Sequence, residues 1–235
     1  MPRLDNALIH LAAAVDKLGR WQTPMRLNET TRAYFEKLAT ISSPERAAIY
    51  KALLDPRSAA GAQTFLREHS PGEYSMLRTS VVPTMLKAGV GANVIPSEAE
   101  ATLDIRALPG EDIEKFYAEM AKVIDDPAVK IVPIPPARPP SPASGLDTDM
   151  YRVMERVART IYGGATVIPS MSTGASDQAQ LRAKGIQSYG IGPASTESED
   201  INYPAHGDVE RLAESSLYPF VQYVWEVVTE VAARR

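Results

Sequence analysis

The sequence contains no cysteine. This absence excludes disulfide bonds, thiolate metal sites and a cysteine nucleophile. No apolar run approaches the roughly 20 residues that a membrane-spanning helix requires, and the amino-terminal stretch is amphipathic rather than a secretory signal. We therefore expect no membrane as a partner, and we take the cytoplasm as the default location.

An excess of positive charge is also lacking. The 25 Lys and Arg residues stand against 29 Asp and Glu residues, for a net charge of −4. A mildly acidic surface has little to offer nucleic acid or an anionic membrane, so small molecules and other proteins remain as partners. With 44% hydrophobic residues, a chain of 235 residues can bury a core, and we expect two domains rather than one.

Histidine is scarce, with three residues in the chain. His10 lies between apolar positions of an expected helix and is interpreted as a surface or boundary residue, whereas His69 ends a helix, where a cation suits the dipole. His206 lies in a loop before a helix, near Asp208 and Glu210, and is a candidate metal ligand or acid/base group. The sequence has no His-Glu-x-x-His helix and no Gly-x-Ser-x-Gly elbow, so it contains neither a self-sufficient zinc motif nor a serine-nucleophile motif.

The most informative stretch is an expected pair of strands at 79–87 and 97–108, joined by a glycine-rich loop that contains Asn93. In the second strand, small and apolar residues at odd positions alternate with polar residues at even positions, which is the period of a half-buried antiparallel strand. Arg106 therefore points away from the core. We expect Asn93 and Arg106 to converge on one ligand, because a guanidinium binds a carboxylate through two parallel hydrogen bonds. The alternative is an arginine that is only solvated or paired with an acidic neighbour.

Residues 1–132 follow the order of helix, helical insertion at about 28–70, two strands, helix and a last short strand at 129–132. This order is typical of a ferredoxin-like α+β sandwich whose opening strand is absent and would precede Met1. The first helix is expected to begin by Leu4. A proline-rich linker is predicted at 133–147, because proline can join neither a sheet interior nor a helix interior.

Residues 148–235 are predicted to alternate between helices and strands, as in part of an α/β sheet. Gly174 either presents backbone amides to a ligand or permits a tight turn. The expected elements are helices at 149–162 and 177–183, strands at 166–169 and 187–191, and a long final helix that starts at Gly207 or Asp208.

Four motifs, in this order and spacing, resemble one family: MPRLDNALIHLA, GANVIPSEAEATLDIRALPGED, STGASDQAQLRAKGIQSYGIG and AHGDVERL. They are similar to the two-zinc metallopeptidases that include aminoacylase, glutamate carboxypeptidase and succinyl-diaminopimelate desuccinylase, and most closely resemble the carboxypeptidase S-like subgroup. The resemblance implies an α/β catalytic domain with two zinc ions, and a ferredoxin-like lid through which two subunits form a homodimer. Residues 1–132 resemble the lid, and residues 148–235 resemble the carboxyl-terminal part of the catalytic domain.

The resemblance also implies roles for individual residues. Asn93 and Arg106 match the residues that hold the substrate carboxylate, Gly174 matches the glycine that lines the substrate site, and His206 matches the final zinc ligand. The implied reaction is metal-dependent hydrolysis of a peptide or an N-acyl amino acid with a free carboxylate, using zinc, cobalt or manganese.

The family's remaining metal ligands, its general-base glutamate and its lid histidine have no match in the chain. The resemblance places them upstream of Met1, so we expect a carboxyl-terminal portion of a longer enzyme. Such a chain has no catalytic residue of its own, supplies at most one metal ligand and is inactive alone. The alternative is a non-catalytic dimerisation or ligand-binding module derived from such an enzyme.

Overall fold

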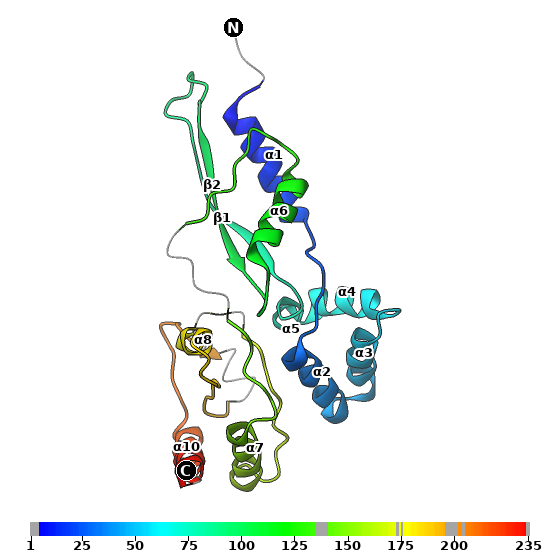
Figure 1. The fold of residues 1–235 in the computed structure, drawn as a ribbon, viewed down its shortest axis with the longest axis vertical. Coiled ribbons are helices and arrows are strands. Elements are labelled where there is room, and N and C mark those ends of the chain that lie inside the picture. Colours follow the sequence, from blue (N-terminus) through cyan, green and yellow to red (C-terminus); the bar gives the residue numbers. More distant parts are fainter. Residues whose placement is uncertain are drawn as a thin grey trace. The chain divides into compact units, whose positions relative to one another are not determined.

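The computed structural model describes residues 5–134, 141–172, 174, 176–195, 202–203 and 205–233. The chain divides into two compact units (Figure 1). The first unit comprises Met1–Ala143 and Ser170–Gly185, and the second comprises Ser144–Pro169 and Ile186–Arg235. None of the helices in the described ranges is both long enough and apolar enough to cross a membrane.

In the first unit, two helices lie side by side on an antiparallel strand pair (Figure 1). These elements are α1 (Ala7–Arg20), β1 (Ser80–Ala88), β2 (Ala99–Arg106) and α6 (Ile113–Ile124). The predicted alternation along β2 is confirmed, because Leu103 and Ile105 pack against the helices while Asp104 and Arg106 are exposed. The helices contribute a buried cluster made of Ala14, Leu18, Phe116, Met120 and Ile124.

Local side-chain contacts define the ends of these helices. Asn6 caps α1 by accepting hydrogen bonds from the backbone N–H groups of Leu8 and Ile9, so the described helix begins at Ala7 rather than at the fourth residue. Asp112 caps α6 in the same way by accepting a hydrogen bond from the backbone N–H of Lys115. At the other end of α6, Asp125 adopts a left-handed conformation with φ of 46° and terminates the helix.

The predicted insertion forms a helical module of four helices, which we define as residues 29–75. Its elements are α2 (Glu29–Ile41), α3 (Pro44–Leu54), α4 (Ala59–His69) and α5 (Pro71–Ser75). The module has its own apolar core, which is separate from the core under α1 and α6. This core comprises Phe35, Tyr50, Leu53, Ala62 and Leu66, together with Met76 and Leu77 directly after the module.

A buried polar junction joins three connecting segments of the first unit: the one before the helical module, the one between the module and β1, and the one between β2 and α6. The hydroxyl of Thr79 and the guanidinium of Arg26 both donate to one oxygen of Glu111. Thr23 donates to the carbonyl of Thr79 at 2.5 Å, and Arg78 donates to the carbonyl of Thr23 at 2.9 Å. Because buried polar groups are costly unless paired, these contacts favour one arrangement of the segments around β1.

Three predicted strands are wrong. Residues 129–132, 166–169 and 187–191 are not strands, and the sheet of the described residues contains only β1 and β2. An extended segment becomes a strand only when it forms a ladder of hydrogen bonds with a neighbouring strand, and in the described part of the chain the strand ladder joins β1 with β2. In the segment 187–191, a side chain rather than a strand pairs with the backbone of Ser188. The hydroxyl of Ser144 accepts from the N–H of Ser188 and donates to its carbonyl.

The second unit is built on two packed helices, α7 (Asp149–Ile161) and α10 (Glu214–Ala233). Arg156 of α7 forms an ion pair with Glu230 of α10 at the edge of the contact. The expected start of the final helix at Gly207 or Asp208 is wrong, because residues 205–209 form turns and α10 begins at Glu214. The shared core comprises Val153, Met154, Val157, Ala158, Tyr223 and Val227.

Candidate functional site

Arg106 is the last residue of β2, where it lies opposite Ser80 of β1. The strand alternation turns its side chain to the exposed face, and its guanidinium is about half exposed. Nε of Arg106 donates to Oδ2 of Asp104 at 2.9 Å. Arg106 therefore presents a cation on an accessible surface, and an acidic side chain of the same strand holds one edge of that cation.

Asn93 lies in the loop between β1 and β2, and its side chain is exposed. The N–H of Val94 donates to the carbonyl of Gly91 at 3.1 Å, so Asn93 occupies a central position of a tight turn. Gly89 has φ of 73° at the start of the loop, a conformation that glycine adopts without strain. The hairpin therefore presents the Asn93 amide at its tip.

The structure does not bring Asn93 and Arg106 onto one ligand within one chain. Asn93 precedes the first residue of β2, Ala99, and Arg106 is the last residue of that strand. The seven residue steps from Ala99 to Arg106 span about 23 Å, because an extended strand rises about 3.3 Å per residue. One amino acid spans only about 3.5 Å in an extended chain, so an amino-acid ligand cannot bridge the two groups.

Gly174 lies in the turn that precedes α8 (Asp177–Ala183), whose bounds match the prediction. Its N–H donates to Oγ of Ser172 at 3.0 Å, and a Cβ at Gly174 would lie 3.1 Å from that same oxygen. A larger residue would therefore crowd this turn. The nearby Met171 packs against the core of the helical module, and Asn28 donates to its sulfur at 3.4 Å.

His206 lies in the second unit, in an exposed loop before α10. Its backbone has φ of 67°, a region in which non-glycine residues are uncommon and which recurs at functional sites. The N–H of His206 donates to Oε2 of Glu210 at 2.8 Å, so Glu210 supports the loop conformation. The sequence indicated that Glu210 lies near His206, but it did not predict this hydrogen bond.

The described residues do not make up a metal site. Across the ranges that the structure covers, no group of three or more His, Asp or Glu residues is arranged to hold a metal ion. A bound zinc ion normally has four ligands, three of them from protein in a catalytic site, so His206 alone does not satisfy this requirement. Of the predicted site residues, Asn93, Arg106 and Gly174 belong to the first unit and His206 to the second.

The contact of Arg106 with Asp104 is the pairing with an acidic neighbour that the sequence offered as the alternative for this arginine. The signal was present, because residues two apart on a strand project from the same face and these two have opposite charges. The tight turn around Asn93 was indicated by Gly89 and Gly91, and the structure confirms it.

The strand pair is covered by two helices on one face and is exposed on the other, and an arginine lies at the end of one strand. The class of domain follows from the sequence of this region: residues 2–132 match the family model described as a peptidase dimerisation domain. This match covers more than half of the chain. The chain belongs to the M20 peptidase family, whose members are hydrolases. The predicted family resemblance and the α/β fold class are thereby confirmed.

Curated relatives support the same assignment. The chain is 26% identical, over 232 residues, to N-fatty-acyl-amino acid synthase/hydrolase PM20D1 of Xenopus tropicalis, with 97% of this chain and 44% of the relative covered. It is also 26% identical, over 229 residues, to carboxypeptidase S-like 2 of Dictyostelium discoideum, with 97% and 43% covered. The chain therefore spans less than half the length of these relatives.

A solved structure has a related fold. The M20 family metallo-carboxypeptidase Sso-CP2 from Sulfolobus solfataricus matches with a TM-score of 0.54 and 18% sequence identity. The match covers 95% of this chain and 52% of that protein. At this level of identity, the similarity shows the fold and does not transfer a substrate.

Proposed function

We propose that the chain provides the lid and the carboxylate-binding residues of a metal-dependent amide hydrolase. The substrate class is a peptide or an N-acyl amino acid with a free carboxylate. The observation that carries this proposal is the exposed guanidinium of Arg106 on the strand pair of a peptidase dimerisation domain. The names of the relatives support the class, because both a carboxypeptidase substrate and an N-acyl amino acid carry a free carboxylate.

Arg106 binds the substrate carboxylate in this proposal. A guanidinium presents paired N–H donors in the plane of a carboxylate, so two parallel hydrogen bonds orient the substrate as well as hold it. The pairing with Asp104 keeps the guanidinium in place before the substrate arrives. When the substrate binds, its carboxylate shares or replaces that contact.

Asn93 acts from a second copy of the chain. Its separation from Arg106 along β2 is too long for one small ligand, whereas a homodimer can bring the hairpin tip of one subunit to the site of the other. The match of residues 2–132 to a dimerisation domain supports this arrangement. In a C2 dimer, the exchange is reciprocal, so each of the two sites receives one Asn93 and one Arg106.

His206 is proposed to supply one metal ligand, and Gly174 to line the substrate site. The full metal centre would hold two zinc ions, or cobalt or manganese, with its remaining ligands outside the described residues. We therefore assign no step of hydrolysis to this chain and propose that it is inactive alone. The domain division proposed with this role is a lid at 1–132, a linker at 133–147 and the carboxyl-terminal part of a catalytic domain at 148–235.

Calorimetric titration tests the carboxylate site. N-acetyl-L-leucine is titrated into the chain and compared with its methylamide, which lacks the charge. We expect the acid to bind about tenfold to 100-fold more tightly, because hydrogen bonds to charged groups contribute about 1.5–3 kcal/mol. Arg106→Lys should remove most of this difference, because lysine lacks the paired donors.

Arg57→Lys is a matched control, because Arg57 is also exposed and also pairs with an aspartate two positions earlier, Asp55. This control should leave the preference unchanged. Equal affinity for acid and methylamide, or equal loss in both variants, would overturn the role of Arg106.

The second candidate is a non-catalytic dimerisation or ligand-binding module. It is favoured by the lack of a three-ligand metal group among the described residues. Metal analysis after dialysis against zinc, with an assay for release of leucine from N-acetyl-L-leucine, tests an expectation that both candidates share, namely that the chain alone does not hydrolyse the amide. Two bound zinc ions and hydrolysis by the chain alone would overturn both the module and our assignment of the other ligands elsewhere.

A further inference from the structure

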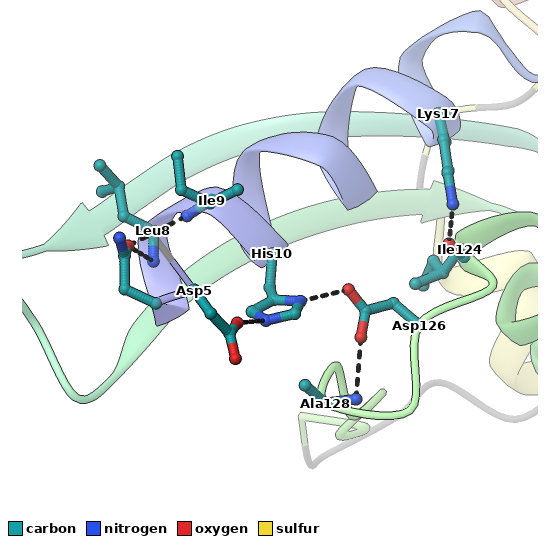
Figure 2. Close-up of polar contacts among 9 residues, drawn as sticks. Asp5, Leu8, Ile9, His10, Lys17, Ile124, Asp126 and Ala128 are labelled. Carbon is teal, nitrogen blue, oxygen red and sulfur yellow. Dashed lines mark hydrogen bonds and ion pairs between the residues drawn. The ribbon is translucent and has the colours of Figure 1, made fainter. Parts of the chain in front are cut away.

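His10 of α1 lies between two carboxylates (Figure 2). Its Nε2 is 2.5 Å from Oδ1 of Asp5, and its Nδ1 is 2.5 Å from Oδ2 of Asp126. The His10 side chain is about one-third exposed and that of Asp126 about one-fifth, so Asp126 is the more enclosed partner. The contact with Asp126 joins residues that are 116 positions apart in the chain.

This geometry requires a particular protonation state. An ionised carboxylate only accepts hydrogen bonds, and a neutral imidazole has one N–H. Both ring nitrogens of His10 face carboxylate oxygens, so both contacts are hydrogen bonds only when the ring is an imidazolium. The loss of one proton from His10 therefore breaks one of the two contacts and removes the charge attraction from both.

Asp126 belongs to the turn that follows α6. Its Oδ1 accepts from the N–H of Ala128 at 2.9 Å, which holds the carboxylate within the turn (Figure 2). Further along α1, Nζ of Lys17 donates to the carbonyl of Ile124, the last residue of α6, at 2.5 Å. The end of α6 is thus attached to α1 at two points, one of which runs through the imidazole of His10.

We propose that Asp5, His10 and Asp126 form a pH-dependent clasp that holds the first turns of α1 against the turn after α6. The clasp closes when His10 is protonated and loosens when it is neutral. The turn leads into residues 129–132, where Val129 and Ile131 pack on the core beneath α1 and α6. The clasp therefore sets how firmly this edge of the dimerisation domain is closed. It does not depend on the proposed role of Arg106 in carboxylate binding.

The electrostatics agree with the geometry. The hydrogen bond to Asp126, followed by the one to Asp5, raises the pKa of His10 above its ordinary value of 6.5. The hydrogen bond from His10, followed by that from Ala128, lowers the pKa of Asp126 below its ordinary value of 3.8. Among the described residues, the charges of Asp5 and Asp126 act on His10. The charges of His10 and Lys17 act on Asp126.

The pH range in which the clasp is closed follows from the directions of these two pKa shifts. The His10 contribution is fully present below pH 6.5 and is lost as the pH rises through the raised pKa of His10. The Asp126 contribution is present above pH 3.8 and is lost as the pH falls through the lowered pKa of Asp126. The clasp is therefore fully closed between these two values and opens on the alkaline side.

The test combines NMR titration of the histidine rings with amide hydrogen exchange in α1, using the 235-residue chain. We expect the His10 midpoint to lie above 6.5 and to fall in Asp126→Asn and in Asp5→Asn. Only Asp126→Asn breaks the link between α1 and the turn after α6. In that variant, the amides of the first turns of α1 should exchange several-fold faster than in the wild type at pH 6, and this difference should shrink at pH 9.

Asp16→Asn is the matched control, because Asp16 is an exposed carboxylate of α1 that pairs with Arg20. It should change neither the His10 midpoint nor the exchange rates. The ring of His69, which contacts the carbonyl of Phe65, gives a second histidine signal in the same spectra for comparison. A His10 midpoint at or below 6.5, or an exchange difference that is the same at pH 6 and pH 9, would overturn the clasp.

Discussion

Arg106 and Asp104 lie two positions apart on the exposed face of β2, where Nε of Arg106 donates to Oδ2 of Asp104 at 2.9 Å. Both side chains are about half exposed. The contact places a carboxylate of the protein next to the group that we propose binds the substrate carboxylate. If Arg106 binds the substrate as proposed, Asp104 competes with the substrate carboxylate for the guanidinium and also limits the motion of that group.

Removal of this competitor should strengthen binding. We expect Asp104→Asn to tighten binding of N-acetyl-L-leucine by up to about fivefold, because an exposed ion pair contributes little and is readily exchanged. Calorimetric titration measures the effect. The control is Glu100→Gln, which removes a charge from the same strand opposite Lys87 and should leave affinity unchanged. Weaker binding by Asp104→Asn would show that positioning by Asp104 outweighs competition.

The helical module should depend on its own core. Leu53 is fully buried there, so Leu53→Ala should lower the free energy of unfolding by about 2–5 kcal/mol through lost burial and a new cavity. Ile41→Ala is the control at an exposed position of the same module and should cost less than about 1 kcal/mol. Urea unfolding followed by circular dichroism compares the two, and similar losses would contradict the burial assigned to Leu53.

The buried polar junction gives a second stability prediction. Thr79 donates to Glu111 and accepts from the N–H of Leu108 at 3.1 Å, so Thr79→Val leaves both groups without this partner. We expect a loss of about 1–3 kcal/mol in the free energy of unfolding, which is typical of unsatisfied buried polar groups. Thr64→Val on the exposed face of α4 is the control. Unchanged stability in Thr79→Val would show that water replaces the hydroxyl.

A tyrosine of the helical module should titrate late. Burial, followed by the charge of Glu73, raises the pKa of Tyr34 to about 12. Its contribution to stability is fully present below its ordinary value of 10 and is lost as the pH rises through about 12. Absorbance titration should show this late tyrosinate, and Tyr34→Phe should remove it. An unchanged titration curve in Tyr34→Phe would exclude Tyr34 as the late group.

Local patterns predicted the elements that depend on near neighbours. The helix at 177–183 has the predicted bounds, because the signals that start and stop a helix operate within a few residues. The strands predicted at 129–132, 166–169 and 187–191 failed, because a strand requires a partner elsewhere in the chain. Alternation correctly predicted the exposure of Arg106. The convergence of Asn93 and Arg106 on one ligand stays a prediction that requires two chains, because β2 separates the two residues within one chain.

Residue order and local period are enough to predict the family, the amphipathic faces of the helices and the exposed side of β2. The contacts between distant groups depend on how the chain folds back on itself. The contact of His10 with Asp126 joins residues 116 positions apart, and no local pattern records it. The separation of Asn93 from Arg106 was likewise decided by the hairpin, because extended backbone keeps its two ends apart.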